Sequence, residues 1–428
     1  MPEREPQNKE LTAPERLSHA AGNAEYAFEA LDKQASERER LHEYFQGKWI
    51  FHPNQVEKLL EGEINGVTPI NAEFVPSLEC PFNCPHCTYT QTGWRKRTIE
   101  QKGERMMDFS SMKILIDKLE EAGVKSLTFT GGGEPLTNPF CVDGIEYARQ
   151  KGLDAGLFTN GALLDKDKIR RLLRTELTFI RLSLNAGIEE VHNKFHGLKK
   201  ESFFARVVKN LELLAEEKVA SRSRTTIGVG VIVNPVNVGN LGEIAQLLKS
   251  IVNSQERDGG IDYVIFRPTV IYIPGRPQYP KEIFERAQEE IGDKVLPVLE
   301  GTSIRVANIE GRFEDVAKEE KDYQKCLAHP WAVSVAYDGG VYLCSETDGM
   351  EDYLLGNLLT QSFDEIWQSE RRRDVIENIG NCPPICKLHF YNKIFSQLLP
   401  ISPQDLPRVK EWIDAERQKG PPEHVNFP

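Results

Sequence analysis

Between residues 72 and 266, short apolar segments alternate with longer segments whose apolar residues repeat at helical spacing. In the longer segment that contains Met112, leucine or isoleucine returns three, four and seven residues later, which places these side chains on one helix face. Strands joined by single helices run parallel, because each helix carries the chain back to where the next strand starts. The alternation therefore predicts an α/β fold with a parallel sheet, open or closed into a barrel. In either form, chemistry belongs at the carboxyl ends of the strands.

The alternation predicts six strands, and both a six-stranded and an eight-stranded barrel accommodate them. The expected strands span residues 72–75, 126–130, 156–158, 178–183, 226–233 and 263–266. The expected helices include residues 112–119, 142–150, 166–173, 203–217 and 241–251.

The two ends of the chain follow other patterns. Residues 1–70 are polar and have a helical pattern, with a run of helix formers at 20–40. A short helix that Asn54 would cap is expected to end at Leu60. After residue 300, the Asp-Gly turn at Asp338 lies between two apolar runs within 332–343, as in a hairpin. A helix at 363–378 and an apolar tail with Phe390, Ile394 and Leu398 follow. Three domains are therefore expected, at 1–70, 71–300 and 301–428.

Charge and hydropathy exclude several classes of protein. The net charge of −12 argues against a broad phosphate-binding surface, so no nucleic-acid partner is expected. The basic stretch Trp94-Arg95-Lys96-Arg97 is short and is interpreted as a solvated loop. No run of about 18 apolar residues occurs, and the first residues lack the apolar stretch of a signal peptide. A cytoplasmic location without a membrane partner is therefore expected.

Eight cysteines in a chain without a secretory signal favour metal ligation over disulfides, because cytosolic thiols are kept reduced. Cys80, Cys84 and Cys87 follow the first strand directly, at the sheet edge where such folds place their sites. Three thiolates on a tight loop can hold three corners of an iron–sulfur cube and leave the fourth iron for another ligand. A structural zinc loop is the alternative, although zinc usually takes a fourth protein ligand and His86 is awkwardly placed for that.

A glycine run and a carboxylate follow the second strand. Gly131, Gly132 and Gly133 permit unusual backbone angles and close approach of a ligand to the main chain. Glu134 adds an acceptor suited to an ammonium group. A glycine run after a strand is weak evidence when alone, and it becomes strong with the cysteine loop one strand earlier.

The CxxxCxxC spacing followed by Gly-Gly-Glu-Pro resembles the radical S-adenosylmethionine (SAM) superfamily, over roughly residues 72–270. The resemblance implies a partial (β/α)6 TIM-like barrel with a helical N-terminal extension. It implies that Cys80, Cys84 and Cys87 hold a [4Fe–4S] cluster whose unique iron takes SAM's amino and carboxylate groups. An electron from the cluster then splits SAM into methionine and a 5′-deoxyadenosyl radical, and the radical abstracts hydrogen from an unactivated carbon. An electron donor such as flavodoxin or ferredoxin is implied as well.

The same resemblance assigns further residues to SAM. The glycine run and Glu134 would contact the methionyl amine, and His86 would occupy a slot near adenine. Ser183 and Asn185 look like a ribose-contacting pair, and Thr159 and Asn160 would line the pocket or form a plain turn. Asn234 and Asn237 resemble the family's adenine-side loop.

Four late cysteines form a second constellation. Cys326 and Cys344 flank Gly339, and Cys382 and Cys386 follow. The pattern resembles the C-terminal SPASM/twitch extension of radical SAM enzymes, a small α+β module. Full SPASM modules carry about seven cysteines, so four favour the shorter form with one auxiliary [4Fe–4S] cluster. Zinc bound by the same four thiolates is the alternative.

Three residues remain with open roles. Arg267, at the end of the sixth strand, is a candidate catalytic residue that could pair with a substrate carboxylate, phosphate or hydroxyl, or form a surface salt bridge. Tyr89, just beyond the cysteine loop, is a comparable candidate for substrate contact. Cys141 is interpreted as a buried free thiol, with a hydrogen-atom donor role as the alternative.

Three functions are compatible with this sequence. The leading interpretation is a radical SAM oxidoreductase or isomerase that acts on a small polar metabolite, such as a sugar, an aminocyclitol or a nucleoside, by oxidation, dehydration or epimerisation. A peptide maturase is the second, although residues 1–70 lack the strand-plus-winged-helix pattern of a leader-peptide recognition domain. A non-enzymatic electron carrier is the third, and Glu134 with its glycines argues against it because a carrier needs no SAM pocket.

Overall fold

The computed structural model describes residues 46–427 with short gaps. The gaps are residues 92, 95–97, 101–102, 104, 254–258, 272–276, 309–312, 314–322, 324–325, 378–385 and 400–402. The run of helix formers at 20–40, residues 95–97 of the basic stretch, and Cys382 therefore lie outside the described residues. The chain divides into two compact units. Unit 1 comprises Met1–Val67, Tyr323–Ala328 and Leu388–Val425, and unit 2 comprises Thr68–Asp322, His329–Lys387 and Asn426–Pro428.

All named strands of the described residues belong to one sheet in unit 2, in the order β10-β9-β8-β1-β2-β3-β4-β5-β6-β7. The strands are β1 Asn71–Phe74, β2 Ser126–Phe129, β3 Asp154–Thr159, β4 Phe179–Ser183, β5 Thr226–Val233, β6 Tyr263–Pro268, β7 Arg305–Asn308, β8 Ala332–Val335, β9 Gly340–Tyr342 and β10 Leu354–Asn357. Strands β1 to β7 pair in parallel with their neighbours, and β8 pairs in parallel with β1. The α/β partial barrel predicted from the sequence is confirmed.

The structure adds parallel strands on both sides of the six predicted ones. On one side, β7 continues the parallel order beyond β6. On the other side, β8 belongs to the predicted hairpin with β9 and also pairs with β1, residue Phe74 standing opposite Val335. The late hairpin is therefore an extension of the barrel sheet, with β9 and β10 forming its antiparallel edge.

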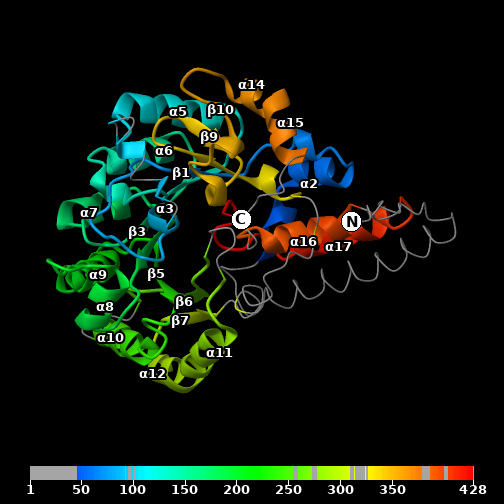
Figure 1. Ribbon diagram of the computed structural model, residues 1–428. Coiled ribbons are helices and arrows are strands. Elements are labelled where there is room, and N and C mark those ends of the chain that lie inside the picture. The colour runs from blue at the N-terminus through cyan, green and yellow to red at the C-terminus, as the bar shows by residue number, and fades with distance from the viewer. Residues whose placement is uncertain are drawn as a thin grey trace, which may run out of the picture. The chain divides into compact units, whose positions relative to one another are not determined.

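The connecting helices form the layer around the strands (Figure 1). Their bounds are α3 Thr88–Gln91, α5 Phe109–Glu121, α6 Cys141–Gln150, α7 Lys166–Arg174, α8 Glu189–Phe195, α9 Phe204–Ser221, α10 Leu241–Asn253, α11 Lys281–Glu290 and α12 Leu296–Leu299. Helix α5 shows why they form: the side chain of Asp108 accepts a hydrogen bond from the Ser111 N–H at its start, and Met112 and the apolar residues at helical spacing after it are buried.

Two helix predictions need correction. The helix expected at 363–378 consists of α14 Phe363–Trp367 and α15 Glu370–Glu377. Ser369 lies between them and accepts a hydrogen bond from the Arg372 N–H at 3.0 Å, as a cap at the start of α15 does. The short helix ending at Leu60 exists as α2 Pro53–Leu60, but Asn54 does not cap it. Pro53 occupies the first turn, where its fixed φ suits a helix start.

Unit 1 is helical in its described part. It contains the 3-10 segments Gln46–Phe51 and Ile64–Gly66, then α2, α16 His389–Leu398 and α17 Leu406–Gln418. Its core brings together segments from both ends of the sequence. The ring of Trp49 packs edge-on against Phe395 at 5.5 Å, and Arg417 donates a hydrogen bond to the Ile50 carbonyl. The compact units thus follow different boundaries from the three expected domains, which remain a proposal about how the sequence is organised. No helix among the described residues is long and apolar enough to cross a membrane.

Successive residues of each strand face opposite sides of the sheet, and the two faces differ in chemistry. One face joins the apolar core under the helices, as Ala72 and Phe74 of β1 do. The other face is polar near β1, where Asn71 donates hydrogen bonds to Ser126 and Thr128 and Glu73 forms an ion pair with Lys387. The inward side of the barrel is therefore suited to a polar ligand.

Large side chains and the end of the chain fill the inward face near the starts of the strands. A side chain at Gly156 would lie 2.2 Å from the ring of Phe179, and one at Gly228 would lie 2.0 Å from Tyr263, so these glycines make room for the rings. The ring of Phe427 packs against Phe179 at 4.9 Å. Asn426 donates a hydrogen bond to Asp154 at 2.7 Å. This leaves the opposite, carboxyl end of the strands for chemistry.

The contact of Phe427 with β4 gives a test of the fold. Replacing Phe427, which is only 8% exposed, with alanine removes buried apolar area and leaves a cavity. We expect a loss of about 2–3 kcal/mol in the free energy of unfolding, below the usual core value because the residue is close to a terminus. Thermal denaturation of Phe427→Ala measures this. The matched control is Leu296→Ala, because Leu296 is 48% exposed and should change stability little. Equal losses in both variants would contradict the packing role.

Candidate functional site

The cysteine loop leaves the carboxyl end of β1. The thiols of Cys80, Cys84 and Cys87 are partly exposed, as ligands of an incoming group must be. The Cys87 N–H donates to the Cys84 carbonyl at 3.1 Å, and α3 begins at the next residue. In the part of the chain that the structure describes, no three His, Cys, Asp or Glu side chains converge around a single metal ion.

The glycine run after β2 packs directly against the chain that leads into the cysteine loop. A side chain at Gly133 would lie 2.2 Å from the carbonyl oxygen of Glu79, and the Glu134 N–H donates to that oxygen at 2.6 Å. Gly131 has a φ of 109°, and a side chain there would lie 2.2 Å from Val75. The glycines predicted to admit a ligand therefore also join the two loops.

Glu134 lies buried between the ends of β2 and β3. One of its carboxylate oxygens accepts a hydrogen bond from the Thr159 hydroxyl at 2.6 Å, and the other accepts one from the Asn160 N–H at 2.7 Å. Burial raises the pKa of Glu134 to about 7, although these hydrogen bonds oppose the rise. The structure thus brings together three residues that the sequence assigned to one pocket, and it gives Glu134 a proton near neutrality. The side-chain amide of Asn160 also lies 3.8 Å from the Cys80 sulfur.

The predicted ribose and adenine contacts lie at the ends of β4 and β5, where their side chains brace the backbone. Asn185 accepts a hydrogen bond from the Ile232 N–H at 2.7 Å, and Asn234 accepts one from the Val236 N–H at 2.8 Å. The amide of Asn237 donates to the carbonyls of Asn185 and Ile232. Ser183 is the last residue of β4 and is partly exposed. Contacts of these residues with SAM stay predictions.

A cluster of histidines and phenylalanines that the sequence did not predict lies against the cysteine loop. His192 and His196 come from α8 and its end, and their rings lie 4.5 Å apart. The ring of His196 contacts Phe82 at 4.6 Å, and its Nδ1 lies 3.1 Å from the Cys84 sulfur. The His-x-x-x-His spacing was the available signal, since it places two histidines on one helix face.

His86 lies inside the cysteine loop and joins the same cluster. Its ring contacts Phe195 at 4.3 Å. Burial lowers the pKa of His86 to about 4, so the imidazole is neutral at physiological pH. A neutral, partly buried ring fits the predicted slot beside a nucleobase better than a charged one.

A second carboxyl group that the sequence did not predict faces the cysteine loop. The Tyr89 hydroxyl donates a hydrogen bond to Asp348 at 3.1 Å. The other carboxylate oxygen of Asp348, Oδ1, is buried, and Ser334 supplies a second polar side chain beside the carboxyl group. Burial raises the pKa of Asp348 to about 7, and the charge of Glu346 adds to the rise. Tyr89, a predicted substrate contact, is therefore paired with a group that can exchange a proton near neutrality.

Trp94 connects these loops. Its ring packs against Tyr89 at 5.3 Å. A side chain at Gly132 would lie 3.0 Å from Trp94, and one at Gly349, where φ is 75°, would lie 1.9 Å from it. The glycine run and the turn that carries Asp348 thus approach the same ring.

The four late cysteines do not all lie in one compact unit of the described structure. Cys326 belongs to unit 1, whereas Cys344 and Cys386 belong to unit 2, and Cys382 is outside the described residues. The Cys344 sulfur lies 3.9 Å from the Thr347 hydroxyl at the start of a 3-10 turn. Their joint ligation of a cluster stays a prediction.

The remaining candidates are Arg267 and Cys141. Arg267 lies on β6 beside Ile232 of β5 and is partly exposed, and its substrate contact stays a prediction. Cys141 is the first residue of α6 and is fully buried. Burial raises the pKa of its thiol far above the usual range, as for a structural cysteine.

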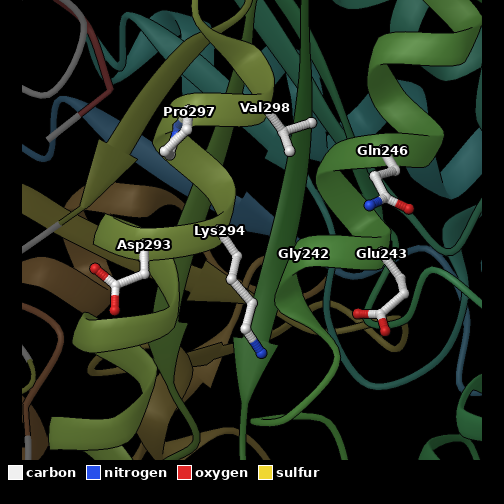
Figure 2. A pocket seen from close by; sticks show the side chains of 7 residues that line it. All are labelled: Gly242, Glu243, Gln246, Asp293, Lys294, Pro297 and Val298. Atoms are coloured by element: carbon white, nitrogen blue, oxygen red, sulfur yellow. The ribbon is translucent and has the colours of Figure 1, made fainter.

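A shallow depression on the helical layer contains none of these residues (Figure 2). It lies between α10 and the helical stretch that ends with α12. Its lining residues are Gly242, Glu243, Gln246, Asp293, Lys294, Pro297 and Val298.

Comparison with known proteins identifies two regions. Residues 74–248 match the Radical SAM superfamily, and residues 326–388 match SPASM, an iron–sulfur cluster-binding domain. The chain is 25% identical to Fe-coproporphyrin III synthase of Methanosarcina barkeri, over 72% of this chain and 76% of that protein. It is 24% identical to dTDP-4-amino-4,6-dideoxy-D-glucose ammonia-lyase of Streptomyces venezuelae, over 82% of this chain and 73% of that protein. The fold resembles that of Streptococcus suis SuiB, with a TM-score of 0.55 and 13% identity over 74% of this chain and 70% of SuiB.

Substitution of Glu134 tests its role in the site. Glu134→Gln removes a charged acceptor, and we expect SAM to bind about tenfold to a hundredfold more weakly. In the wild type the acceptor form is lost as the pH falls through the pKa of about 7, so SAM affinity should fall from pH 8 to pH 6. In the variant the affinity should be independent of pH over this range. Equilibrium dialysis with labelled SAM measures both effects.

Thr159→Val is the matched control, since it removes one hydrogen bond to Glu134 and keeps the carboxylate. Because this hydrogen bond lowers the pKa of Glu134, we expect the variant to approach wild-type affinity only at higher pH, where the carboxylate is ionised. A Glu134→Gln protein with unchanged affinity, or a Thr159→Val protein with an equal loss, would contradict the assignment of the amine contact to Glu134.

Proposed function

We propose that this chain, which belongs to the radical SAM superfamily and carries a C-terminal SPASM iron–sulfur domain, abstracts hydrogen from a small polar metabolite such as a sugar, an aminocyclitol or a nucleoside. One observation carries the proposal. The cysteine loop and the buried Glu134 lie on loops joined at the carboxyl ends of β1 and β2, close in sequence to Glu73, which forms an ion pair with Lys387 on the inward face of β1. Oxidation, dehydration and epimerisation are the reactions open to such a site.

The residues present fit the group that the family implies. Cys80, Cys84 and Cys87 would hold the [4Fe–4S] cluster, and their partly exposed thiols are accessible to it. When bound, the cluster supplies the electron that splits SAM into methionine and a 5′-deoxyadenosyl radical. Glu134 would orient the methionyl amine, and the neutral ring of His86 would lie beside the adenine.

Asp348 supplies the proton acceptor. Oxidation of a carbon radical next to a hydroxyl or amine releases one proton and one electron. The electron would pass to the auxiliary cluster proposed on the late cysteines, and the proton needs a base within hydrogen-bond reach. Asp348 is buried and has a pKa of about 7, the range in which general bases are most effective. Tyr89 fixes its other oxygen.

Two observations support a small molecule over a peptide. The relatives that match over 72% and 82% of this chain carry names that refer to a porphyrin and a nucleotide sugar. The inward face near the strand starts is filled by Phe179, Tyr263 and Phe427, which leaves less depth for a chain-like substrate. The test is incubation of the reduced enzyme and SAM with deuterated metabolite fractions and, separately, with deuterated peptides. Deuterium in 5′-deoxyadenosine from a metabolite fraction supports the proposal, and transfer from peptides alone overturns it.

The cluster assignment gives a direct prediction. Replacing Cys80, Cys84 and Cys87 together with alanine removes the ligands, so dithionite-dependent formation of 5′-deoxyadenosine should be abolished. Anaerobic product analysis by liquid chromatography measures this. Cys141→Ala is the control, because that buried cysteine is outside the loop, and it should retain the activity. Product formation by the triple variant would remove the proposed mechanism.

The auxiliary site gives a second prediction. If Cys326, Cys344, Cys382 and Cys386 hold one further [4Fe–4S] cluster, anaerobic reconstitution should yield about eight irons per chain. The triple variant of the first loop should then retain about four. Iron and zinc analysis of both proteins measures this. About four irons with one zinc in the wild type would contradict the auxiliary cluster.

The role of Asp348 gives a third prediction. Asp348→Asn should lower kcat by about 10²–10⁴ and leave SAM affinity unchanged, because only the proton transfer is affected. The wild-type rate should rise with pH through about 7, as Asp348 loses its proton beside the charge of Glu346. Glu346→Gln is the control, and it should only shift the midpoint of the profile to lower pH. A pH profile unchanged in Asp348→Asn would contradict the role.

A further inference from the structure

The contact between His196 and Cys84 joins a buried imidazole to a thiol of the cysteine loop. Nδ1 of His196 lies 3.1 Å from the Cys84 sulfur, and the side chain is 2% exposed. Its other ring nitrogen, Nε2, is buried and has no hydrogen-bond partner among the described residues. All polar contact of this ring that the structure shows is therefore directed at the sulfur.

The chemistry of the thiol decides which atom donates. A cysteine that ligates iron is a thiolate, which has no proton and can only accept a hydrogen bond. The proton of the pair must therefore be on Nδ1 of His196, and Nε2 carries the lone pair.

The surroundings fix the ring in this orientation. It lies between the rings of Phe82, at 4.6 Å, and Phe195, at 5.3 Å. The backbone of His196 is fixed beside the cysteine loop without help from its side chain. Its carbonyl accepts a hydrogen bond from the Asn83 N–H at 3.1 Å. Gly197 adopts a φ of 63°, and a side chain there would lie 2.3 Å from the Asn83 carbonyl oxygen. The end of α8 is thus anchored to the loop between Cys80 and Cys84 by main-chain contacts.

We propose that His196 is a positioning residue that donates a hydrogen bond from Nδ1 to the Cys84 thiolate and so raises the reduction potential of the cluster. The inference rests on the proposed function, since it requires a cluster on Cys84. Hydrogen bonds to ligating sulfur favour the reduced, more negative state of a cluster, because more charge resides on sulfur in that state. The ring thereby sets how readily the cluster accepts the electron that begins catalysis.

The chain contains a matched control for packing. His192 is fully buried on the same helix, and its ring also packs against Phe82, at 5.7 Å. Its ring shows contacts with Phe82, His196 and Phe204 and none with a cysteine sulfur among the described residues. A residue that only fills space and a residue that acts on sulfur can therefore be compared within one cluster.

The test is a redox titration of the reconstituted full chain, followed by electron paramagnetic resonance of the reduced cluster. At the potential where the wild-type cluster is half reduced, His196→Phe should lower the ratio of reduced to oxidised cluster about tenfold, a midpoint shift of about 59 mV to more negative potential. His196→Asn should stay near the wild type, because its amide nitrogen occupies the place of Nδ1. His192→Phe should leave the midpoint unchanged.

Each outcome decides the inference. A His196→Phe protein with full iron content and a wild-type midpoint overturns it, and so does an equal shift in His192→Phe. If His196→Phe loses its iron, His196→Leu takes its place, and an unshifted midpoint there also overturns the inference. The proposed function is assessed separately by 5′-deoxyadenosine formation in the wild type. A wild type that forms the product while His196 variants show no shift leaves the function standing and removes only this role.

Discussion

The contact on which the site depends is the one between the glycine run and the backbone before Cys80. The Glu79 carbonyl accepts the N–H of Glu134, and only a residue without a side chain fits at Gly133. This contact joins the loops after β1 and β2, so that cysteines and carboxylate are held on neighbouring loops before any ligand arrives. Preorganisation of this kind reduces the ordering cost of binding. A glycine position usually explained by ligand approach is thus also fixed by the protein's own packing.

Local patterns in the sequence predicted what local chemistry determines. The helix with Met112 was predictable because its apolar face repeats every three to four residues and is buried. The cysteine loop and glycine run were predictable because each follows a strand and combines residue types with few other uses. The parallel pairing of β8 with β1 was not predictable, because nothing local in residues 332–335 specifies a partner so distant in sequence. The same reason hid Asp348 and His196, whose significance arises only from contacts with Tyr89 and Cys84.

The asparagines at the strand ends show a second limit of prediction. A polar residue near a site must also satisfy buried backbone groups, which are costly to leave unpaired. Asn237 uses its amide for two carbonyls, and Asn185 uses its oxygen for the Ile232 N–H. A motif indicates that such residues matter, and the structure shows that part of their contribution is to hold the ends of β4 and β5 in place.

The protonation state that burial favours in the two carboxyl groups differs from the one that their proposed roles need. Burial raises the pKa of Glu134 from 4.5 and that of Asp348 from 3.8, both to about 7. The folded chain therefore retains protons that the unfolded chain releases, so each group makes folding less favourable as the pH rises toward 7, after which the effect is constant. The roles proposed for Glu134 and Asp348 require the opposite, deprotonated form of both. An amine bound beside Glu134 would lower the pKa of this carboxyl group again. Ligand binding would therefore increase the free energy of unfolding.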